Sequence, residues 1–404
     1  MKILFFTPFM PGPPVFGGQR RVHGLMTALA KSHEVSLVSL VDPSLDLGPA
    51  LADARQYCRE IVTVPDPLHR AAGRVKRVRQ LQSMLSLQSW EEQQYLRPVM
   101  QRALEQHLAT RHYDIINTEF SYMGGYRFPV KRSGANATKL VLDEHNVEFD
   151  ILRRTANATR FDRRVYNALN YRKLRREELR AWRSFDGVAF TSERDDGIAR
   201  TEVPGVRTAV IPNGVDVDAF RPDESTPTTP LSVLFFGAIN YFPNTDAVHF
   251  FVKEVAPLLA RKHPNAVIRI VGPGAPPEVQ ALASERIQIV GFVEDLHKEI
   301  ARATVVVAPL RIGGGTRLKI VEAMAVAKPI VSTTIGAEGI DVSHGRDILL
   351  ADKPEDFARE IGRVLEDEGL QRRLGKAARE TAEAHYSWSA AAQKLSAFYA
   401  SLLG

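Results

Sequence analysis

The feature that most constrains this chain is a regular alternation of short apolar runs with longer helical stretches. In the first half, seven runs rich in β-forming residues are typical of buried strands: residues 2–7, 34–41, 60–64, 114–119, 139–144, 187–192 and 208–212. Helical stretches lie between most of them, such as residues 20–31, where Val22, Leu25, Met26 and Leu29 recur at helical spacing. Alternating strands and helices predict a parallel sheet whose connections are right-handed crossovers.

A second series of the same kind follows a polar, proline-rich stretch. Its predicted strands are residues 233–237, 266–272, 287–290, 304–309, 329–333 and 348–351, and residues 387–403 have helical periodicity. Because 404 residues exceed the size of one ordinary domain, we expect two. The sequence therefore predicts an α/β fold with two doubly wound, Rossmann-like domains at residues 1–220 and 231–386, a linker at 221–230 and a C-terminal helix at 387–404.

The composition is that of an ordinary soluble globular protein, with 25% charged and 44% hydrophobic residues. Cys58 is the single cysteine, so no disulfide can form within the chain, and a reducing, cytoplasmic setting is expected. The apolar N-terminus is interrupted by Pro8 and Pro11, and it predicts a buried first strand rather than a signal peptide. No apolar run approaches the ~18 residues that span a membrane, and no Cys/His cluster has metal-ligand spacing.

The net charge of +6 is concentrated locally. Residues 151–186 contain eleven Lys or Arg and four Asp or Glu, and residues 69–79 are also basic. A basic helix of this kind is a solvated face, a patch that docks on an anionic membrane, or a nucleic-acid-binding patch. No recognised nucleic-acid motif accompanies it, so we expect no nucleic-acid partner. The first two alternatives stay open: the protein is soluble, or it is peripheral to the inner face of a membrane.

The most informative motif follows the predicted strand that ends near residue 309. The string GGGTRLK places three glycines, residues 313–315, shortly before Arg317 and Lys319, which open a predicted helix. Glycine lets the backbone turn sharply and approach a ligand closely. A helix N-terminus attracts phosphate through its N–H groups and its dipole, and two cations at the same point strengthen that attraction.

Glu322 lies one to two turns into the same predicted helix. A carboxylate at this place can accept hydrogen bonds from sugar hydroxyls, as acids do in other nucleotide sites. The segment thus indicates a site for a diphosphate attached to a ribose. The structural alternative is a tight strand-to-helix turn in which Lys319 and Glu322 form a surface pair.

This segment also resembles a known family. Residues 314–331 read GGTRLKIVEAMAVAKPIV, which is similar to the motif E-G-F-G-x-x-x-x-E-A-M-A-x-G-x-P-V-V of GT-B glycosyltransferases in family 4, or glycosyl transferases group 1. The matching positions are Glu322, Ala323, Met324, Ala325, Pro329 and Val331. The first Glu of the family motif falls on Gly314, as in a GGGTRLK subgroup of these enzymes.

The resemblance implies a GT-B glycosyltransferase over nearly the whole chain, with two facing domains, an active-site cleft and a last helix that crosses back to the first domain. It implies a nucleotide-sugar donor such as a UDP- or GDP-sugar and a glycan or lipid-linked acceptor. It also implies retention of anomeric configuration. We expect no metal and no other cofactor, because no ligand cluster is visible in the sequence and Arg317, Lys319 and the helix dipole can supply the positive charge. The implied site residues in the motif are Gly314, Gly315, Thr316 and Glu322 for the donor, with Arg317 and Lys319 stabilising the leaving diphosphate.

Gly17 and Gly18 resemble the N-terminal glycine loop of the family, which lies near the donor phosphates and the acceptor. They follow the first predicted strand and precede the first predicted helix. Arg20 or Arg21 could add positive charge there. The structural alternative is an ordinary helix-start turn.

His145 follows the predicted strand 139–144, at the sheet edge where ligand residues usually sit. The family has a His-Asp or similar pair here, close to the donor sugar, so the resemblance implies a catalytic role for His145. Asp143, Glu144 and Glu148 are alternatives for a general base, and the sequence does not rank them.

Gly237 begins a turn that faces the diphosphate in the family. The Arg and Lys that often follow it are absent here, and the cations of the GGGTRLK motif can take their place. Gly272, Phe292 and Val293 lie in loops that hold the base in the family, mostly through backbone contacts. Such contacts leave little residue signature, so the base, the donor sugar and the acceptor are not readable from the sequence.

Because Gly314 replaces a carboxylate, this position cannot form a covalent glycosyl intermediate. A front-face reaction, in which the leaving phosphate deprotonates the acceptor, fits the sequence better. Two other classes stay open: a nucleotide-sugar epimerase of the same fold, which product analysis would separate, and a non-catalytic basic binding protein. A dehydrogenase is disfavoured, since no G-x-G-x-x-G follows the first strand.

Overall fold

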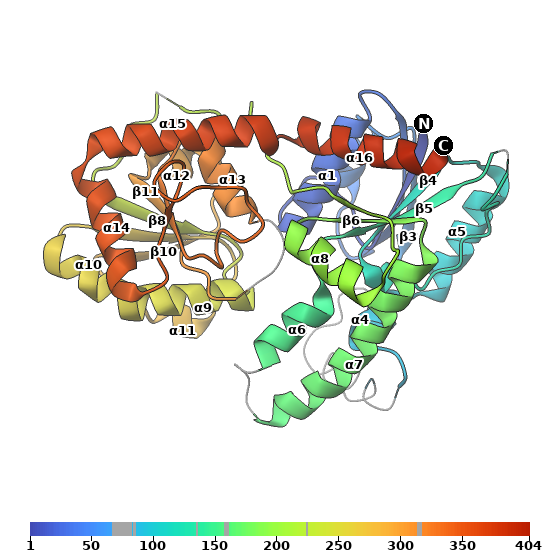
Figure 1. Cartoon of the computed structure of the whole chain (residues 1–404), viewed down its shortest axis with the longest axis horizontal. Coiled ribbons are helices and arrows are strands. Elements are labelled where there is room, and N and C mark those ends of the chain that lie inside the picture. Colours follow the sequence, from blue (N-terminus) through green and yellow to red (C-terminus); the bar gives the residue numbers. More distant parts are fainter. Residues whose placement is uncertain (67–82, 84–85, 135, 157–160, 224, 313–316) are drawn as a thin grey trace. The chain divides into compact units, whose positions relative to one another are not determined.

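The computed structural model describes residues 1–66, 83, 86–134, 136–156, 161–223, 225–312 and 317–404, without side chains at 155–156 and 161–166. The basic run at residues 69–79 lies outside the described residues. The chain divides into two compact units (Figure 1). The first combines Met1–Pro212 with Ala391–Gly404, and the second contains Asn213–Ala390. Each is an α/β unit with a parallel sheet, as the sequence predicts.

The first unit is organised around a parallel sheet. Its described strands are β1 (Lys2–Thr7), β2 (Glu34–Val41), β3 (Glu60–Pro65), β4 (Ile115–Glu119), β5 (Lys139–Glu144), β6 (Gly187–Phe190) and β7 (Thr208–Val210). They lie in the order β3-β2-β1-β4-β5-β6-β7, with Ile3 of β1 beside Val35 of β2 and Ile115 of β4. The strand order reverses between β1 and β4, which is where open α/β sheets bind ligands beyond the carboxyl ends of their strands.

Helices cover both faces of this sheet. Those described are α1 (Gly17–Leu29), α2 (Gly48–Ala54), α4 (Trp90–Tyr95), α5 (Pro98–Thr110), the 3₁₀ turn η1 (Ser121–Met123), α6 (Glu148–Ala156), α7 (Phe161–Ser184), α8 (Glu193–Glu202) and most of α16 (Trp388–Leu403). On one face α5, α7 and α8 bury Leu104, Trp182 and Ala199 in a single core. The C-terminal helix α16 joins the unit through Tyr399, whose hydroxyl donates to Asn117 Oδ1 of β4 at 2.8 Å.

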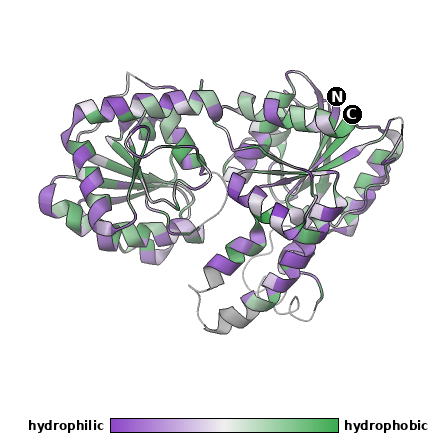
Figure 2. Ribbon diagram, viewed as in Figure 1, coloured by the Kyte–Doolittle hydropathy of each residue, from purple (hydrophilic) through white to green (hydrophobic). Residues whose placement is uncertain are grey.

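The second unit has a six-stranded parallel sheet within the described residues. Its strands are β8 (Ser232–Phe236), β9 (Val267–Val271), β10 (Ile287–Gly291), β11 (Val305–Ala308), β12 (Ile330–Ser332) and β13 (Leu349–Leu350), in the order β10-β9-β8-β11-β12-β13. Val233 and Phe235 of β8 belong to the core on one face, and Leu234 and Phe236 to the core on the other. Both faces are buried, which explains why the strands are almost continuously apolar (Figure 2).

Two groups of helices bury these faces. One face packs against α9 (Phe242–Phe250), the π-helical turn η2 (Phe251–Val255), α10 (Ala256–Lys262) and α14 (Pro354–Glu366), and the other against α12 (Leu296–Arg302), α13 (Leu318–Ala325) and part of α15 (Glu368–His385). The short α11 (Pro277–Gln280) follows β9. The carboxyl ends of the strands therefore stay at one edge of the sheet, where their loops meet.

The boundary between the units lies at Pro212, whereas the composition places it after residue 220. The reason is Val215, which is buried in the same core as Leu234. Its N–H donates to Tyr386 O at 2.7 Å, and it pairs with Ser387 in a parallel bridge. The polar, proline-rich stretch consequently lies within the second unit rather than between the units.

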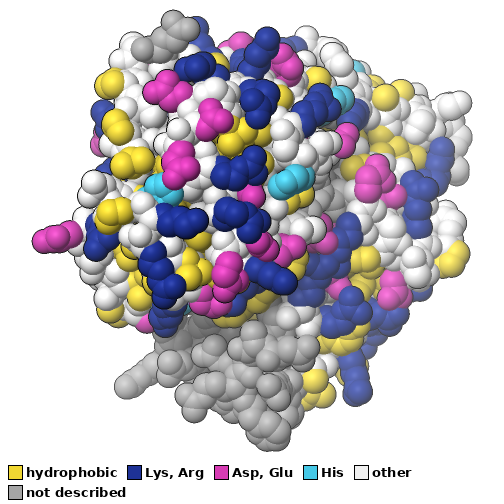
Figure 3. All heavy atoms as spheres, turned by 60° about the vertical axis from the view of Figure 1, so that its left-hand side comes forward, with side chains coloured by type: hydrophobic (Ala, Val, Ile, Leu, Met, Phe, Trp, Pro, Cys, Tyr) yellow, Lys and Arg dark blue, Asp and Glu magenta, His cyan; other side chains and the backbone are white. Residues whose placement is uncertain are grey.

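Surface charges are interspersed rather than segregated on the face that Figure 3 shows. On α14, Arg359 pairs with Asp356 and Arg363 with Glu360, three residues away in each case. The exposed pair of Arg359 and Asp356 contributes little to stability, but both pairs balance charge locally. Among the described residues, no helix combines the length and the apolar character that a membrane span requires.

The described cations of α7 are largely engaged within the first unit. Arg175 pairs with Glu202 of α8, and Arg180 pairs with Glu92 of α4. The apolar Leu174, which directly precedes Arg175, is buried in the core of the unit. These contacts favour the interpretation that this part of the basic stretch stabilises the fold over the interpretation that it is a membrane-binding face.

Candidate functional site

The candidate site in the second unit is built where β8, β9 and β10 end. Gly237 and Gly272 directly follow β8 and β9, and both have positive φ angles, 144° and 145°. A Cβ on Gly272 would lie 1.8 Å from the Gly237 carbonyl oxygen, so only glycine permits this backbone approach. Gly237 N donates to Val271 O at 3.0 Å, and Gly272 N to Gly291 O at 2.7 Å. The glycines thus tie three strand ends together.

Lys319 lies beside the Gly237 turn although the two are far apart in the sequence. Its Nζ is 3.3 Å from the place that a Cβ on Gly237 would take, and it donates to Asn244 Oδ1 at 2.7 Å. It also lies 4.2 Å from the centroid of the Phe235 ring. Burial, followed by the charge of Arg317, lowers the pKa of Lys319 to about 7. The structure thus places a cation at a turn whose own sequence supplies none.

Arg317 and Glu322 complete this cluster. Arg317 is the N-cap residue of α13, so its charge stands at the N-terminus of the helix. Glu322 is 3% exposed, and its charge favours the protonated form of Lys319, though less than burial and Arg317 oppose it. An exposed Lys319–Glu322 pair, the structural alternative drawn from the sequence, is wrong, because Glu322 is buried and Lys319 donates to Asn244.

The loops expected to hold the base lie within the described residues, whereas residues 313–316 of the glycine loop do not. Phe292, directly after β10, is 66% exposed, and Val293 packs against the core. The predicted donor residues Gly314, Gly315 and Thr316 lie outside the described residues. Their contribution to the site stays a prediction.

In the first unit, Gly17 and Gly18 begin α1. A Cβ on Gly18 would lie 3.1 Å from the Phe16 ring and 3.4 Å from the rings of Phe9 and Phe120. Gly18 therefore allows three aromatic rings to pack around the start of the helix. This packing is a structural reason for glycine here, beside the ligand contact that the family resemblance implies.

Arg21 is buried, and it neutralises Asp143. Its side chain is 1% exposed and that of Asp143 is 0% exposed. Nη2 donates to Asp143 Oδ1 at 2.6 Å, Nε to Oδ2 at 3.0 Å, and Nη1 to Ile211 O at 2.9 Å. The expectation that Arg21 adds charge for the donor, and the alternative that Asp143 is the general base, are therefore wrong, because each group is committed to the other.

His145 is the end of a buried chain of hydrogen bonds. Its Nε2 lies 2.7 Å from Glu119 Oε2, and Asn117 Nδ2 donates to Glu119 Oε1 at 2.8 Å. Tyr399 of α16 donates in turn to Asn117. The Phe120 ring covers the imidazole, with ring centroids 3.8 Å apart. The sequence did not reveal this chain, because its members come from β4, the end of β5 and the C-terminal helix.

The protonation of this chain follows from burial. Burial, with a smaller effect of Arg21, lowers the pKa of His145 well below its ordinary value. Burial, with the charge of Asp143 next, raises the pKa of Glu119 well above its ordinary value. Both shifts favour the uncharged forms of His145 and Glu119. The contact with a donor sugar that the family resemblance implies stays a prediction.

Glu119, Asp143 and His145 also form a cluster with potential metal ligands, which their spacing in the sequence does not suggest. One ligand atom from each lies within 4.8 Å of the others. A cation there would face the guanidinium of Arg21, which already occupies both oxygens of Asp143. In the part of the chain that the structure describes, this group therefore does not fit a metal ion and acts as a polar network.

Glu144 and Glu148 are the remaining acids near His145. Glu144 accepts from Trp182 Nε1 at 2.8 Å and from Ser121 N at 3.1 Å, and burial raises its pKa to about 8. Burial, and then the charge of Glu91, raises the pKa of Glu148 to about 7. Glu148 is half-buried, so it combines some exposure with a pKa close to neutrality.

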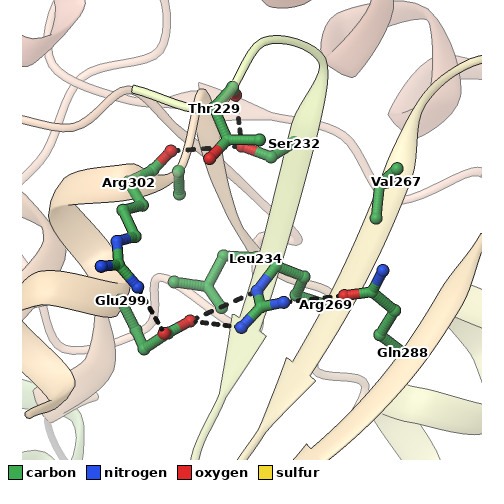
Figure 4. Close-up of a pocket in the computed structure, with 9 residues that line it drawn as sticks. Thr229, Ser232, Leu234, Val267, Arg269, Gln288, Glu299 and Arg302 are labelled. Carbon is green, nitrogen blue, oxygen red and sulfur yellow. Dashed lines mark hydrogen bonds and ion pairs between the residues drawn. The ribbon is translucent and has the colours of Figure 1, made fainter. Parts of the chain in front are cut away.

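A separate cavity of about 360 Å³ lies on the amino-terminal halves of β8 and β9 (Figure 4). It is lined by Thr229, Ser232, Leu234, Val267, Arg269, Gln288, Glu299, Arg302 and Ala303. Arg269 donates to Gln288 Oε1 at 2.7 Å and to Glu299 Oε2 at 2.8 Å, so its guanidinium is engaged in the wall. The cavity is apart from the strand ends that carry Gly237 and Gly272, and we assign no ligand to it.

Known protein families match both units. The family described as Glycosyltransferase Family 4 matches residues 15–219, and the family described as Glycosyl transferases group 1 matches residues 230–367. The first match alone covers half of the chain. The chain therefore belongs to the family 4, group 1 glycosyltransferases, as its EAMA motif and glycine loop predict.

Two curated relatives illustrate the similarity. The chain is 28% identical over 220 residues to D-inositol 3-phosphate glycosyltransferase of Corynebacterium urealyticum, covering 48% of this chain and 51% of the relative. It is 28% identical over 217 residues to phosphatidyl-myo-inositol mannosyltransferase of Mycobacterium tuberculosis, covering 50% and 56%. The chain thus spans about half the length of the curated relatives it matches.

Solved structures share the fold at lower identity. Sucrose-phosphate synthase from Thermosynechococcus elongatus superposes with a TM-score of 0.71 at 20% identity, covering 100% of this chain and 99% of that one. HepE from Anabaena, solved with UDP-glucose, gives a TM-score of 0.68 at 16% identity, covering 99% and 100%. These similarities show the GT-B fold.

Proposed function

We propose that this chain is a glycosyltransferase that moves a sugar from a nucleoside-diphosphate donor to a hydroxyl group, with retention of configuration and without a metal ion. The observation that carries the proposal is the cation pair Arg317 and Lys319 at the N-terminal end of α13, with Lys319 beside the Gly237 turn. Family membership makes a nucleotide-sugar donor the natural ligand of such a pair.

The chemistry needs positive charge at this place. When the bond between the anomeric carbon and the diphosphate breaks, negative charge develops on the departing phosphate oxygen. Arg317, Lys319 and the N-terminus of α13 are positioned to stabilise that oxygen. The proposed metal independence rests on these cations, because they supply the charge that a metal would otherwise supply.

The proposed retention rests on the family resemblance, and the residues of the site bear on how it would occur. Retaining hydrolases use two carboxylates close together, one of which attacks the sugar. In this chain Gly314 stands where the family motif has its first Glu, and Glu322 is buried within α13. We therefore favour a front-face reaction: the acceptor hydroxyl forms the new C–O bond on the side from which the diphosphate leaves, and a phosphate oxygen takes the hydroxyl proton.

The donor and the acceptor are proposed by class. HepE was solved with UDP-glucose, which supports a UDP- or GDP-sugar donor whose ribose hydroxyls bind Glu322. The curated relatives are named for inositol phosphate and phosphatidylinositol substrates, which supports an acceptor hydroxyl on a glycan or a lipid-linked molecule. A lipid-linked acceptor would bring the protein to an anionic membrane surface, and sedimentation with anionic vesicles tests that part separately.

The proposal is tested by a thermal-shift panel of UDP-, GDP- and ADP-sugars, followed by product analysis with the donor that binds. We expect one nucleotide class to raise Tm, because a ligand that binds only the folded state stabilises it. Transfer to an acceptor, or slow hydrolysis of the donor, should persist in EDTA. Failure of every nucleotide sugar to bind would refute the proposal. Activity that EDTA abolishes and Mg²⁺ or Mn²⁺ restores would refute metal independence, and an epimerised donor would assign the chain to the epimerase alternative.

A further inference from the structure

Asn244 is a buried polar residue in the first turn of α9, and it is 7% exposed. Its side-chain amide joins two segments that are distant in the sequence. Nδ2 donates to Ala238 O at 2.8 Å, and Oδ1 accepts from Lys319 Nζ at 2.7 Å. Because the N–H end of the amide is used by the loop between β8 and α9, the carbonyl end faces Lys319. The backbone of that loop therefore sets the orientation of the amide.

The Asn244 amide is a neutral partner, so it does not neutralise the positive charge of Lys319. The charged groups that act on it are Arg317, which opposes protonation, and Glu322, which favours it less strongly than burial and Arg317 oppose it. From β8 and α9, the groups in contact with the ammonium are the Phe235 ring and the Asn244 amide. An amide oxygen stabilises the ammonium by a hydrogen bond, but it does not neutralise the ammonium as a carboxylate would.

A second contact on the same helix shows the contrast. Two residues beyond Asn244, Asp246 binds Arg311, which precedes the glycine loop. Arg311 Nη2 donates to Asp246 Oδ1 at 2.7 Å, and Nε donates to Oδ2 at 3.0 Å. One turn of α9 thus gives an acid to Arg311 and a neutral amide to Lys319. Only the second arrangement keeps positive charge for an anionic ligand.

We propose that Asn244 is a positioning residue of the diphosphate site. It holds the Lys319 amino group at the Gly237 turn without giving it a carboxylate partner, so that the diphosphate of a bound nucleotide stabilises the protonated form and Lys319 takes up a proton on binding. This inference rests on the proposed function, because it identifies how that site recognises the diphosphate of its donor. The lowered pKa of Lys319, about 7, agrees with it, since a group with this pKa is partly neutral at physiological pH.

The experiment is calorimetry of the full chain with UDP, GDP and inorganic pyrophosphate at pH 7.5, in two buffers of different ionisation enthalpy. At this pH the terminal phosphates of UDP and GDP are already largely ionised, so proton uptake with these two ligands reports mainly on the protein. The wild type should take up roughly half a proton or more per diphosphate. Lys319→Ala should abolish that uptake, and it also measures whatever proton exchange belongs to the ligand itself.

Two substitutions at Asn244 should change the uptake in opposite directions. Asn244→Ala removes the acceptor, so Lys319 becomes more fully neutral: binding should weaken roughly 10-fold to 100-fold, as for the loss of a hydrogen bond to a charged group, and proton uptake should rise. Asn244→Asp pairs Lys319 with a carboxylate: binding should weaken at least as much, and proton uptake should fall toward zero. The aspartate is nearly isosteric, so the test survives if the alanine variant fails to fold.

Gln280→Ala is the matched control, because Gln280 Nε2 also donates to a loop carbonyl, that of Ala275, at 2.9 Å. It should leave affinity and proton uptake unchanged. Wild-type affinity in both Asn244 variants, or weaker binding with unchanged proton uptake, would overturn the inference and leave Asn244 as a structural residue. If the wild type binds none of the three probes, the proposed function itself fails, which separates the two failures.

Discussion

Both units carry a charged cluster where their strands end, and the two clusters use charge in different ways. In the first unit, Arg21 and Asp143 are almost completely buried, and the guanidinium donates hydrogen bonds to both carboxylate oxygens. In the second, Lys319 meets a neutral amide and a second cation, Arg317, acts against its protonation. The buried Arg21–Asp143 ion pair joins α1 to β5 but offers no charge to a ligand. A cation without a carboxylate partner is unfavourable in the free protein and becomes favourable when an anion binds.

The largest expected effect concerns the buried ion pair of Arg21 and Asp143 in the first unit. Arg21→Met should lower the free energy of unfolding by about 3–5 kcal/mol, because it leaves the carboxylate of Asp143 buried without its partner. Removing both charges in Arg21→Met/Asp143→Leu should cost much less. Chemical denaturation measures this, and UDP affinity of the folded protein should be unchanged. If Arg21→Met were as stable as the wild type, the Arg21–Asp143 pair would not be a stabilising contact of the first unit.

The next largest effect is expected for the two cations of the second unit, Arg317 and Lys319. Arg317→Ala or Lys319→Ala should lower kcat/KM by roughly 10²-fold or more, the scale for one lost group that stabilises developing charge. Neither variant should be less stable than the wild type, since neither side chain fills a core and the charge of Lys319 is unfavourable in the free protein. Lys328→Ala is the control, because Lys328 lies just past the other end of α13 and its Nζ donates to Thr228 Oγ1. Wild-type kinetics in both cation variants would remove the proposed difference between the clusters.

The smallest expected effect is a pH dependence of opposite sign in the two units. Burial raises the pKa of Glu144 to about 8 and of Glu148 to about 7, so the folded first unit binds more protons than the unfolded chain from about pH 4.5 upward, and its stability falls as pH rises through these values. The loss should be about 1–3 kcal/mol between pH 5 and 8. Lys319 acts in reverse: its pKa is lowered to about 7, so its contribution to stability rises with pH between about 7 and 10.5.

Denaturation of the wild type, Glu148→Gln and Lys319→Met at several pH values measures these trends. The glutamine variant should flatten the fall below pH 8, and the methionine variant should flatten the rise above pH 7. Identical pH profiles in all three proteins would show that neither group titrates in the folded state with a shifted pKa.

The architecture could be predicted from local patterns. Residues 2–7 and 34–41 are apolar enough to be buried on both faces, and the structure has strands at Lys2–Thr7 and Glu34–Val41. Alternation with helices then requires parallel pairing, because each connection must cross over the sheet. The EAMA motif and the glycine loop were enough to identify the family. The composition placed the end of the first unit too late in the chain. The polar, proline-rich stretch at residues 221–230 looks like a linker, but Val215, which precedes it, is already buried in the same core as Leu234.

The partners of the charged side chains were decided by the tertiary structure alone. Sequence identified Arg317, Lys319 and Glu322 as one cluster, since one helix start carries all three. It could not show that Lys319 meets Asn244 and the Gly237 turn, or that Arg21 is taken by Asp143. Strand and helix periods are local properties that each segment encodes by itself. Which polar groups face each other across strands and helices depends on sheet order and register, which arise only when the whole core packs.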